Sequence, residues 1–279
     1  MFDSVAIVDW SAASAPSPAR PSADAIWIGV AGQEPAYFRT RAAAEGWITN
    51  WLAAERVVGR NVLIGFDFPM GYPAGFAARL TGRAQAQAVW AWLADHITDG
   101  PDNANNRFAV ASAVNRAFGG QGPFWGCPAG QVTEFLQARK RVDYAALGLH
   151  ERRAVEQMVP RAQPVWKLYT TGSVGSQALM GLPMVHRLAQ QGARVWPFEE
   201  MGQVTLAEVY PSLLAGPVAA RGDSIKDRAQ VQLLAQAVMA LGQAGQLQPL
   251  FDVPDVAREE GWILGAGHAQ VLENALKWS

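Results

Sequence analysis

The chain has 279 residues, of which 50% are hydrophobic and 17% are charged, with a formal net charge of −1. That size and composition can bury one large core, so we expect a single domain over residues 1–279. No apolar run approaches the roughly 20 residues of a membrane span, and Asp3 and Asp9 interrupt the stretch that a signal peptide would need. We therefore expect a cytoplasmic protein without a membrane partner. The near-neutral charge argues against a chain that coats nucleic acid nonspecifically.

The first third of the chain predicts three strands, a helix and a fourth strand. Apolar runs at 4–10, 25–30 and 36–38 are separated by turn-rich links, a pattern typical of an antiparallel meander. A helix over 42–56 has an apolar stripe at helical spacing, and the strand 62–67 follows it. A helical crossover allows that fourth strand to lie parallel to the first.

A long insertion interrupts the fold after the fourth strand. Residues of about 72–164 are rich in Ala, Gln and Arg, contain no repeat, and predict a mostly helical insertion. The stretch 101–167 holds nine Lys or Arg against five Asp or Glu. Two interpretations stay open, namely a solvated helical surface and a guide for phosphate groups.

The last third returns to strands and helices. Residues 165–169 resemble a short strand, and the Gly/Ser loop 170–176 opens toward a helix expected near 183–191. Backbone N–H groups of such a loop can hold an anion, although ordinary turn chemistry explains it as well. An edge strand at 194–198 then leads into the strand 204–209.

Three buried strands end at or near a carboxylate. The runs 5–9, 62–67 and 204–209 carry Asp9, Asp67 and Glu208 respectively. If the strands are neighbours, these acids can converge, and converging carboxylates repel unless a cation neutralises them. The single cysteine and the absence of CxxC and HExxH patterns leave no thiolate or zinc-type site, so the pattern predicts a hard cation bound by oxygen.

A fourth acid heads the helix that follows residue 222. Asp227 lies four residues before Val231 on the apolar stripe of this helix, so it begins the buried side. Ser224 and Asp227 also form an S-x-x-D pattern, and helix capping alone is the other explanation.

The order of these elements resembles the ribonuclease H-like fold. The stretches 7–11, 64–71, 207–211 and 260–265 are similar to a bacterial family of unknown function described as predicted ribonuclease H-like nucleases. The resemblance implies an α/β fold in which a mixed sheet, made of a three-strand antiparallel meander plus parallel strands, is flanked by helices. It also implies that Asp9, Asp67 and Glu208 bind metal. Asp227 is a less typical fourth acid, because many members carry a clearer Asp-Ala pair inside a late helix, and here only the stretch 226–229 begins one.

This set of residues predicts a metal-dependent phosphodiesterase or nuclease. Two Mg²⁺ or Mn²⁺ ions, bridged by Asp9, would activate water and stabilise the leaving oxygen of a phosphodiester. Positive or polar groups are then expected at the phosphate, and the candidates are Lys167, Ser173 and Arg228. The partner would be nucleic acid or a small nucleotide.

Two alternatives remain. The fold also supports ATP-dependent phosphotransferases, although the stretch after Asp9 lacks the glycine of their phosphate turn. The other is a nucleotide- or cofactor-binding accessory protein, since similar chains have been associated with molybdopterin guanine dinucleotide synthesis. No residue supports that association independently.

Overall fold

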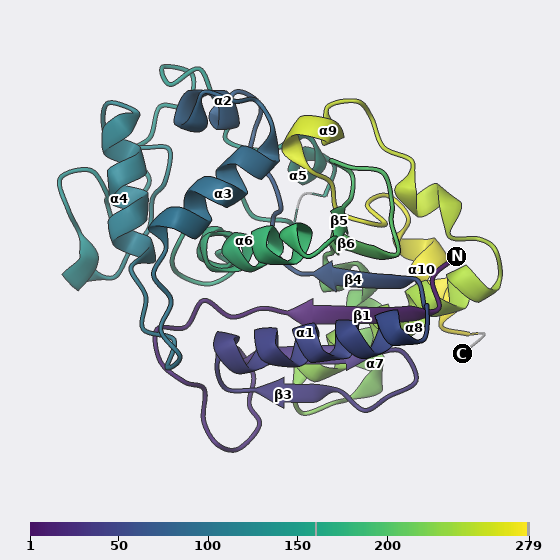
Figure 1. Cartoon of the computed structure of the whole chain (residues 1–279). Helices are drawn as coiled ribbons and strands as arrows, with labels where there is room; N and C mark the ends of the chain where they lie inside the picture. Colours follow the sequence, from purple (N-terminus) through teal and green to yellow (C-terminus); the bar gives the residue numbers. More distant parts are fainter. Residues whose placement is uncertain (160, 278–279) are drawn as a thin grey trace.

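The computed structural model describes residues 1–159 and 161–277 as an α/β arrangement around one mixed sheet (Figure 1). The sheet has six strands in the order β3-β2-β1-β4-β6-β5. In chain order the strands are β1 (Ser4–Asp9), β2 (Ile26–Val30), β3 (Ala36–Phe38), β4 (Val62–Phe66), β5 (Arg194–Val195) and β6 (Val204–Glu208).

Helices lie on both faces of the sheet and at its edges. The α-helices are α1 (Arg41–Val57), α2 (Phe76–Thr81), α3 (Ala86–His96), α4 (Arg107–Ala117), α5 (Ala154–Met158), α6 (Gly175–Gln190), α7 (Ala215–Arg221), α8 (Lys226–Gln243), α9 (Ala257–Glu260) and α10 (Ala269–Ala275). Three 3-10 helices cover Ala129–Gln131, Pro211–Leu214 and Gln248–Phe251. None of the helices among the described residues combines the length and apolar character needed to cross a membrane.

Strand directions confirm the predicted meander and crossover. β2 pairs antiparallel with both β1 and β3, whereas β4 pairs parallel with β1. β6 extends the parallel part beside β4, and β5 forms its edge. The carboxyl ends of β1, β4 and β6 therefore meet at one edge, and in Figure 1 the arrowheads of β1 and β4 point toward the side that carries α4.

Side-chain alternation divides the strands between two buried cores. Val8 and Phe66 belong to a core that α1 and α6 cover, and this core continues into the insertion. Ile7 and Leu63 face the opposite core, which α8 and α10 cover. Because every second residue points to the same face, these assignments also fix where the strand-end acids point.

α8 packs unusually close to the sheet at Gly29 of β2. A Cβ atom added to Gly29 would lie 2.7 Å from the backbone carbonyl carbon of Val231. Val231 lies one helical turn after Asp227, so the small residue sets how near Asp227 approaches the edge of β1.

Gly29→Ala is expected to destabilise the protein by about 1–3 kcal/mol, because the backbone of α8 has to move away from the sheet. Urea unfolding measures the change. Gly46→Ala in α1 is the matched control, since its added Cβ meets no atom within 4 Å and alanine stabilises a helix interior by about 0.5–1 kcal/mol. Equal midpoints for Gly29→Ala and wild type would contradict the close contact.

The insertion is less helical than its composition predicts. α2, α3, α4 and α5 lie within it, but residues 118–153 contain only one short 3-10 helix among turns and loops. Gly119, Gly126 and Gly148 adopt positive φ in this stretch, and such residues end helices rather than continue them.

Three local predictions in the last third differ from the structure. Residues 165–169 form a single bridge, Trp125 with Lys167, instead of a strand. α6 begins at Gly175, not near 183, and takes Pro183 into its interior. The capping pair at the start of α8 is absent, since its N-cap is Ile225 and no side chain caps it.

Candidate functional site

Two predicted acids meet at the carboxyl edge of the sheet. Asp9 ends β1 and Asp67 follows β4 directly, and the backbone N–H of Asp67 donates to the Val8 carbonyl over 3.1 Å. Asp9 continues the alternation of Ile7, and Asp67 that of Gly65, which pairs with Ile7. Both carboxylates therefore lie on the face that α8 covers, and each remains partly exposed to solvent.

The charges of the two carboxyl groups interact, and burial is the main cause that favours their protonated forms. Burial raises the pKa of Asp9 well above its ordinary value, and the negative charges of Asp67, Asp227 and Asp24 raise it further. Burial also raises the pKa of Asp67 to about 7. The N–H of Trp10, which donates to Asp67 Oδ1 over 2.8 Å, opposes part of that shift in pKa. The pair therefore takes up a proton more readily than two separate carboxyl groups would.

Asp227 adds a third negative charge from the first turn of α8. Its charge raises the pKa of both Asp9 and Asp67, so it lies close to the pair. Asp227 Oδ2 accepts a hydrogen bond of 2.8 Å from the backbone N–H of Asp24, and burial raises the pKa of Asp227 itself. The predicted Asp227 is therefore brought to the site, where it ties the loop before β2 to α8.

Glu208 does not join these acids, which corrects the predicted convergence. It pairs in register with Phe66, and Phe66 with Val8, so it lies on the face opposite to Asp9. Val209 is the residue level with Asp67, and it is buried and apolar. The one-residue offset reverses the face because side chains alternate along a strand.

Arg153 neutralises Glu208 inside the protein. Its Nη1 and Nη2 donate to the two Glu208 oxygens over 2.7 and 2.6 Å, and its Nε donates to Glu156 Oε1 over 2.8 Å. Arg153, Glu156 and Glu208 are at most 3% exposed. The Met70 N–H also donates to Glu208, so both oxygens of this carboxylate are bound by structural partners.

Two of the three predicted phosphate ligands, Lys167 and Ser173, lie in the loop before α6, and the third, Arg228, lies in the first turn of α8. Lys167 donates from Nζ to the Thr171 carbonyl over 2.8 Å, and Ser173 lies in the turn before α6 with its N–H bound to the Thr170 carbonyl. Arg228 lies one residue after Asp227 but forms a two-bond ion pair with Asp223 at 2.8 and 2.9 Å. The positive charge of Arg228 is therefore already neutralised by Asp223.

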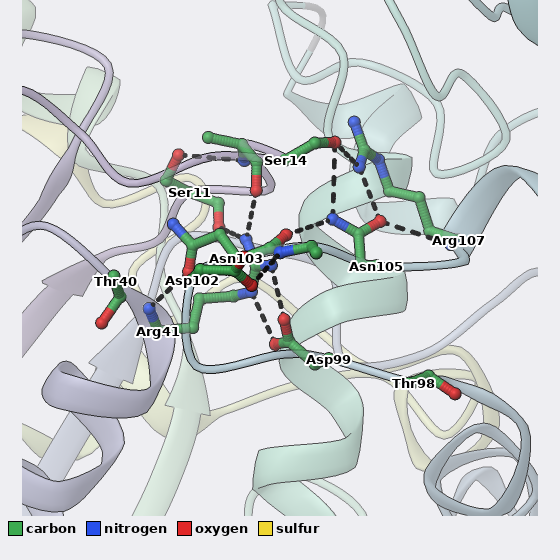
Figure 2. A network of polar contacts seen from close by, with 12 residues as sticks. Ser11, Ser14, Thr40, Arg41, Thr98, Asp99, Asp102, Asn103, Asn105 and Arg107 are labelled. Carbon is green, nitrogen blue, oxygen red and sulfur yellow. Dashed lines mark hydrogen bonds and ion pairs between the residues drawn. The ribbon is translucent and has the colours of Figure 1, made fainter.

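A buried arginine fixes the loop that leaves Asp9 (Figure 2). Arg41, the first residue of α1, donates from Nη1 to the carbonyls of Ser11 and Ala13 over 3.0 and 2.8 Å. Its Nε and Nη2 form an ion pair with Asp99, and Nη2 also reaches the Asn103 carbonyl. Residues 11–13 are thus held in place beside the acid pair.

Sequence analysis missed Asp24, Arg41 and Arg153. Asp24 had a usable signal, because β2 runs antiparallel to β1 and so begins at the edge where β1 ends. The partners of Arg41 lie 28 or more positions away in the chain, so Arg41 had no local signal. Arg153 has a local partner in Glu156, but its pairing with Glu208, 55 positions away, had none.

The acids do not form a complete metal cage by themselves. In the part of the chain that the structure describes, no group of three or more His, Cys, Asp or Glu side chains is close enough to hold one ion. Asp9 and Asp67 nevertheless fit a divalent cation as a pair, because a cation removes the repulsion between two neighbouring carboxylates. Mg²⁺ needs only one or two carboxylates when water and substrate phosphates supply the remaining ligands.

The fold and site define an α/β protein with a pair of coupled carboxyl groups at the carboxyl edge of a mixed sheet. No family model matches the sequence, and comparison with curated proteins and with solved structures finds no match. Function is therefore inferred from the site.

Proposed function

We propose that the protein is a Mg²⁺- or Mn²⁺-dependent phosphodiesterase that acts on nucleic acid. The observation that carries the proposal is the pair of Asp9 and Asp67 at the carboxyl ends of the adjacent parallel strands β1 and β4, with Asp227 beside it. The antiparallel meander followed by parallel β4 and β6 agrees with the ribonuclease H-like arrangement that the sequence resembles.

The donor set favours one cation over two. Asp9 and Asp67 would hold it, whereas Glu208 is bound to Arg153 on the other face and is not available for a second ion. When bound, the cation would polarise the phosphate and lower the pKa of a coordinated water. Its positive charge also removes the repulsion that otherwise keeps a proton on the pair.

The chain supplies orientation and a proton acceptor. The Trp10 N–H fixes one oxygen of Asp67, so the carboxylate cannot rotate freely. Asp24 fixes Oδ2 of Asp227 in the same way, which leaves Oδ1 to take a proton from the attacking water. The raised pKa of Asp227 suits a general base.

Asp9→Asn is expected to lower the hydrolysis rate by about a hundredfold or more, because one anionic ligand of the cation is lost. Wild type and variant are tested in Mg²⁺ and in Mn²⁺ on single-stranded DNA, RNA, duplex DNA, RNA–DNA hybrid and ATP. Asp95→Asn, an exposed residue of α3, is the matched control.

Cleavage that persists in Asp9→Asn at the wild-type rate would contradict the proposal. Hydrolysis of ATP, with no cleavage of any nucleic acid, would replace it with an ATP-dependent activity of the same acids.

A further inference from the structure

Arg107 is a buried cation, and among the described residues its side chain donates hydrogen bonds only to neutral groups. It is the first residue of α4 and is 8% exposed. Nε donates to Ser176 Oγ over 3.0 Å, and Nη1 donates to Ser14 Oγ and Asn105 Oδ1 over 2.8 and 2.7 Å. Figure 2 shows Arg107 beside Ser14 and Asn105 at the far end of the network from Arg41. The guanidinium is thus held rigidly without being neutralised.

No carboxylate of the described residues lies within 4 Å of the Arg107 guanidinium, although Arg41 is ion-paired to Asp99 at 2.6 Å. Burial and, to a smaller extent, the positive charge of Arg41 lower the pKa of Arg107 to about 10, with Asp99 as a partial compensation. A buried charge without a counter-charge is costly. The arrangement is therefore one that an anion would stabilise.

One side-chain nitrogen of Arg107, Nη2, donates no hydrogen bond to the described residues. This nitrogen is also not among the fully buried side-chain atoms that have no partner, so it stays accessible. An anion that reaches the guanidinium can therefore bind at Nη2 without displacing Ser14 or Ser176.

The first turn of α6 lies next to this guanidinium. Ser176, the second residue of the 16-residue α6, accepts from Arg107 Nε and donates to the Leu168 carbonyl over 2.6 Å. The N–H of Gly175 already donates to the Lys167 carbonyl over 2.9 Å, and the N-cap Val174 provides no side-chain hydrogen bond, so the N–H groups of Ser176 and Gln177 are the ones left for an anion. The helix dipole adds partial positive charge at the same place.

A short chain of contacts joins this place to the acid pair. Gln177, adjacent to Ser176, donates from Nε2 to the Trp10 carbonyl over 2.8 Å. The N–H of the same Trp10 donates to Asp67. Cationic and acidic groups therefore lie on either side of Trp10 at the carboxyl edge of the sheet, the acids toward α8 and Arg107 toward α6.

We propose that Arg107 Nη2 and the first turn of α6 bind a second phosphate of the substrate, next to the phosphate that reacts at Asp9 and Asp67. This inference rests on the proposed function and narrows its substrate class. A substrate that fills both places carries at least two phosphates in sequence, as a nucleic acid strand does and a nucleoside monophosphate does not. Arg107 then sets which phosphodiester lies over the acids.

The test compares Arg107→Gln with Arg116→Gln, which removes an exposed arginine from the same helix. Binding of a short single-stranded phosphorothioate oligonucleotide is measured by fluorescence anisotropy at several salt concentrations, and binding of inorganic pyrophosphate by calorimetry. We expect Arg107→Gln to weaken oligonucleotide affinity about 10- to 100-fold and to reduce the slope of log K against log salt by about one, because one phosphate contact is lost. Arg116→Gln should leave both unchanged.

Arg107→Lys covers the case in which Arg107→Gln fails to fold. Lysine keeps the charge but not the planar fork, so affinity should fall several-fold while the salt slope stays near that of wild type. Wild-type oligonucleotide and pyrophosphate affinities in both Arg107 variants would overturn the inference.

Two further readouts separate this inference from the proposed function. The Mn²⁺-induced rise in melting temperature should survive in Arg107→Gln, since the cation site is distinct. Pyrophosphate binding that depends on Arg107, in a protein that cleaves no nucleic acid, would support the anion site and contradict the phosphodiesterase. Cleavage that depends on Asp9 but is unaffected by Arg107→Gln would support the phosphodiesterase and contradict the anion site.

Discussion

Asp67→Asn is expected to raise the melting temperature of the metal-free protein at pH 8 and to abolish its stabilisation by Mn²⁺. Asn keeps an oxygen for the Trp10 N–H but removes one of two charges that repel each other. The folded pKa of Asp67, about 7, lies above its ordinary 3.8. The native state therefore binds more protons between these values, and this contribution to stability is lost as the pH rises from about 4 to about 7.

Thermal unfolding between pH 4 and pH 8, with and without Mn²⁺, measures both effects. Wild type should lose stability across that window without metal, and Asp67→Asn should show a shallower slope. A hundredfold excess of Mn²⁺ over its Kd stabilises by about 2.7 kcal/mol, which raises the melting temperature of wild type by several degrees. Glu208→Gln should retain that rise, because Glu208 lies on the other face. A rise of equal size in Asp67→Asn would contradict the cation site.

Arg153→Ala is expected to lower the free energy of unfolding by about 3–5 kcal/mol, because it leaves Glu208 and Glu156 buried without their counter-charge. Burial already raises the pKa of Glu156 even with Arg153 present. Urea unfolding at pH 7 measures the loss, and Arg139→Ala, an exposed residue, should change stability by less than about 0.5 kcal/mol.

Neutralising the two carboxylates provides the decisive comparison for this cluster. The triple variant Arg153→Met, Glu156→Gln, Glu208→Gln should recover a large part of the stability lost in Arg153→Ala, since no unpaired charge remains. A triple variant no more stable than Arg153→Ala would show that packing, and not charge, accounts for the loss.

Where the chain carries a strong local pattern, the sequence predicts the element. The alternating or continuous apolar runs of β1, β2 and β4 and the helical stripe of α1 are confirmed by the structure. The insertion and the start of α6 are predicted less well. Gly/Pro-rich loops form few regular hydrogen bonds, and Pro183 falls inside a helix that it would be expected to begin.

The candidate site shows the same division. Asp9 and Asp67 can be predicted because each terminates a buried strand, and parallel strands align their carboxyl ends. Glu208 has the same local signal but points to the other core, since its register with Phe66 is set by pairing across the sheet. The local sequence shows that side chains alternate along a strand, but it does not show how that strand is aligned with its neighbour, which decides which residues lie level with each other.

The sequence by itself determined the strands and the helix of the first third, the carboxylates at the strand ends, and the acid at the head of α8, because these depend on residues near one another in the chain. Only the tertiary structure decided which acids share a face, that Arg153 neutralises Glu208, and that Arg107 remains without a carboxylate partner. Those outcomes depend on contacts between residues 55 to 93 positions apart. Such contacts leave no periodic trace in the sequence, since a charged side chain looks the same whether its partner is a carboxylate, a hydroxyl or water.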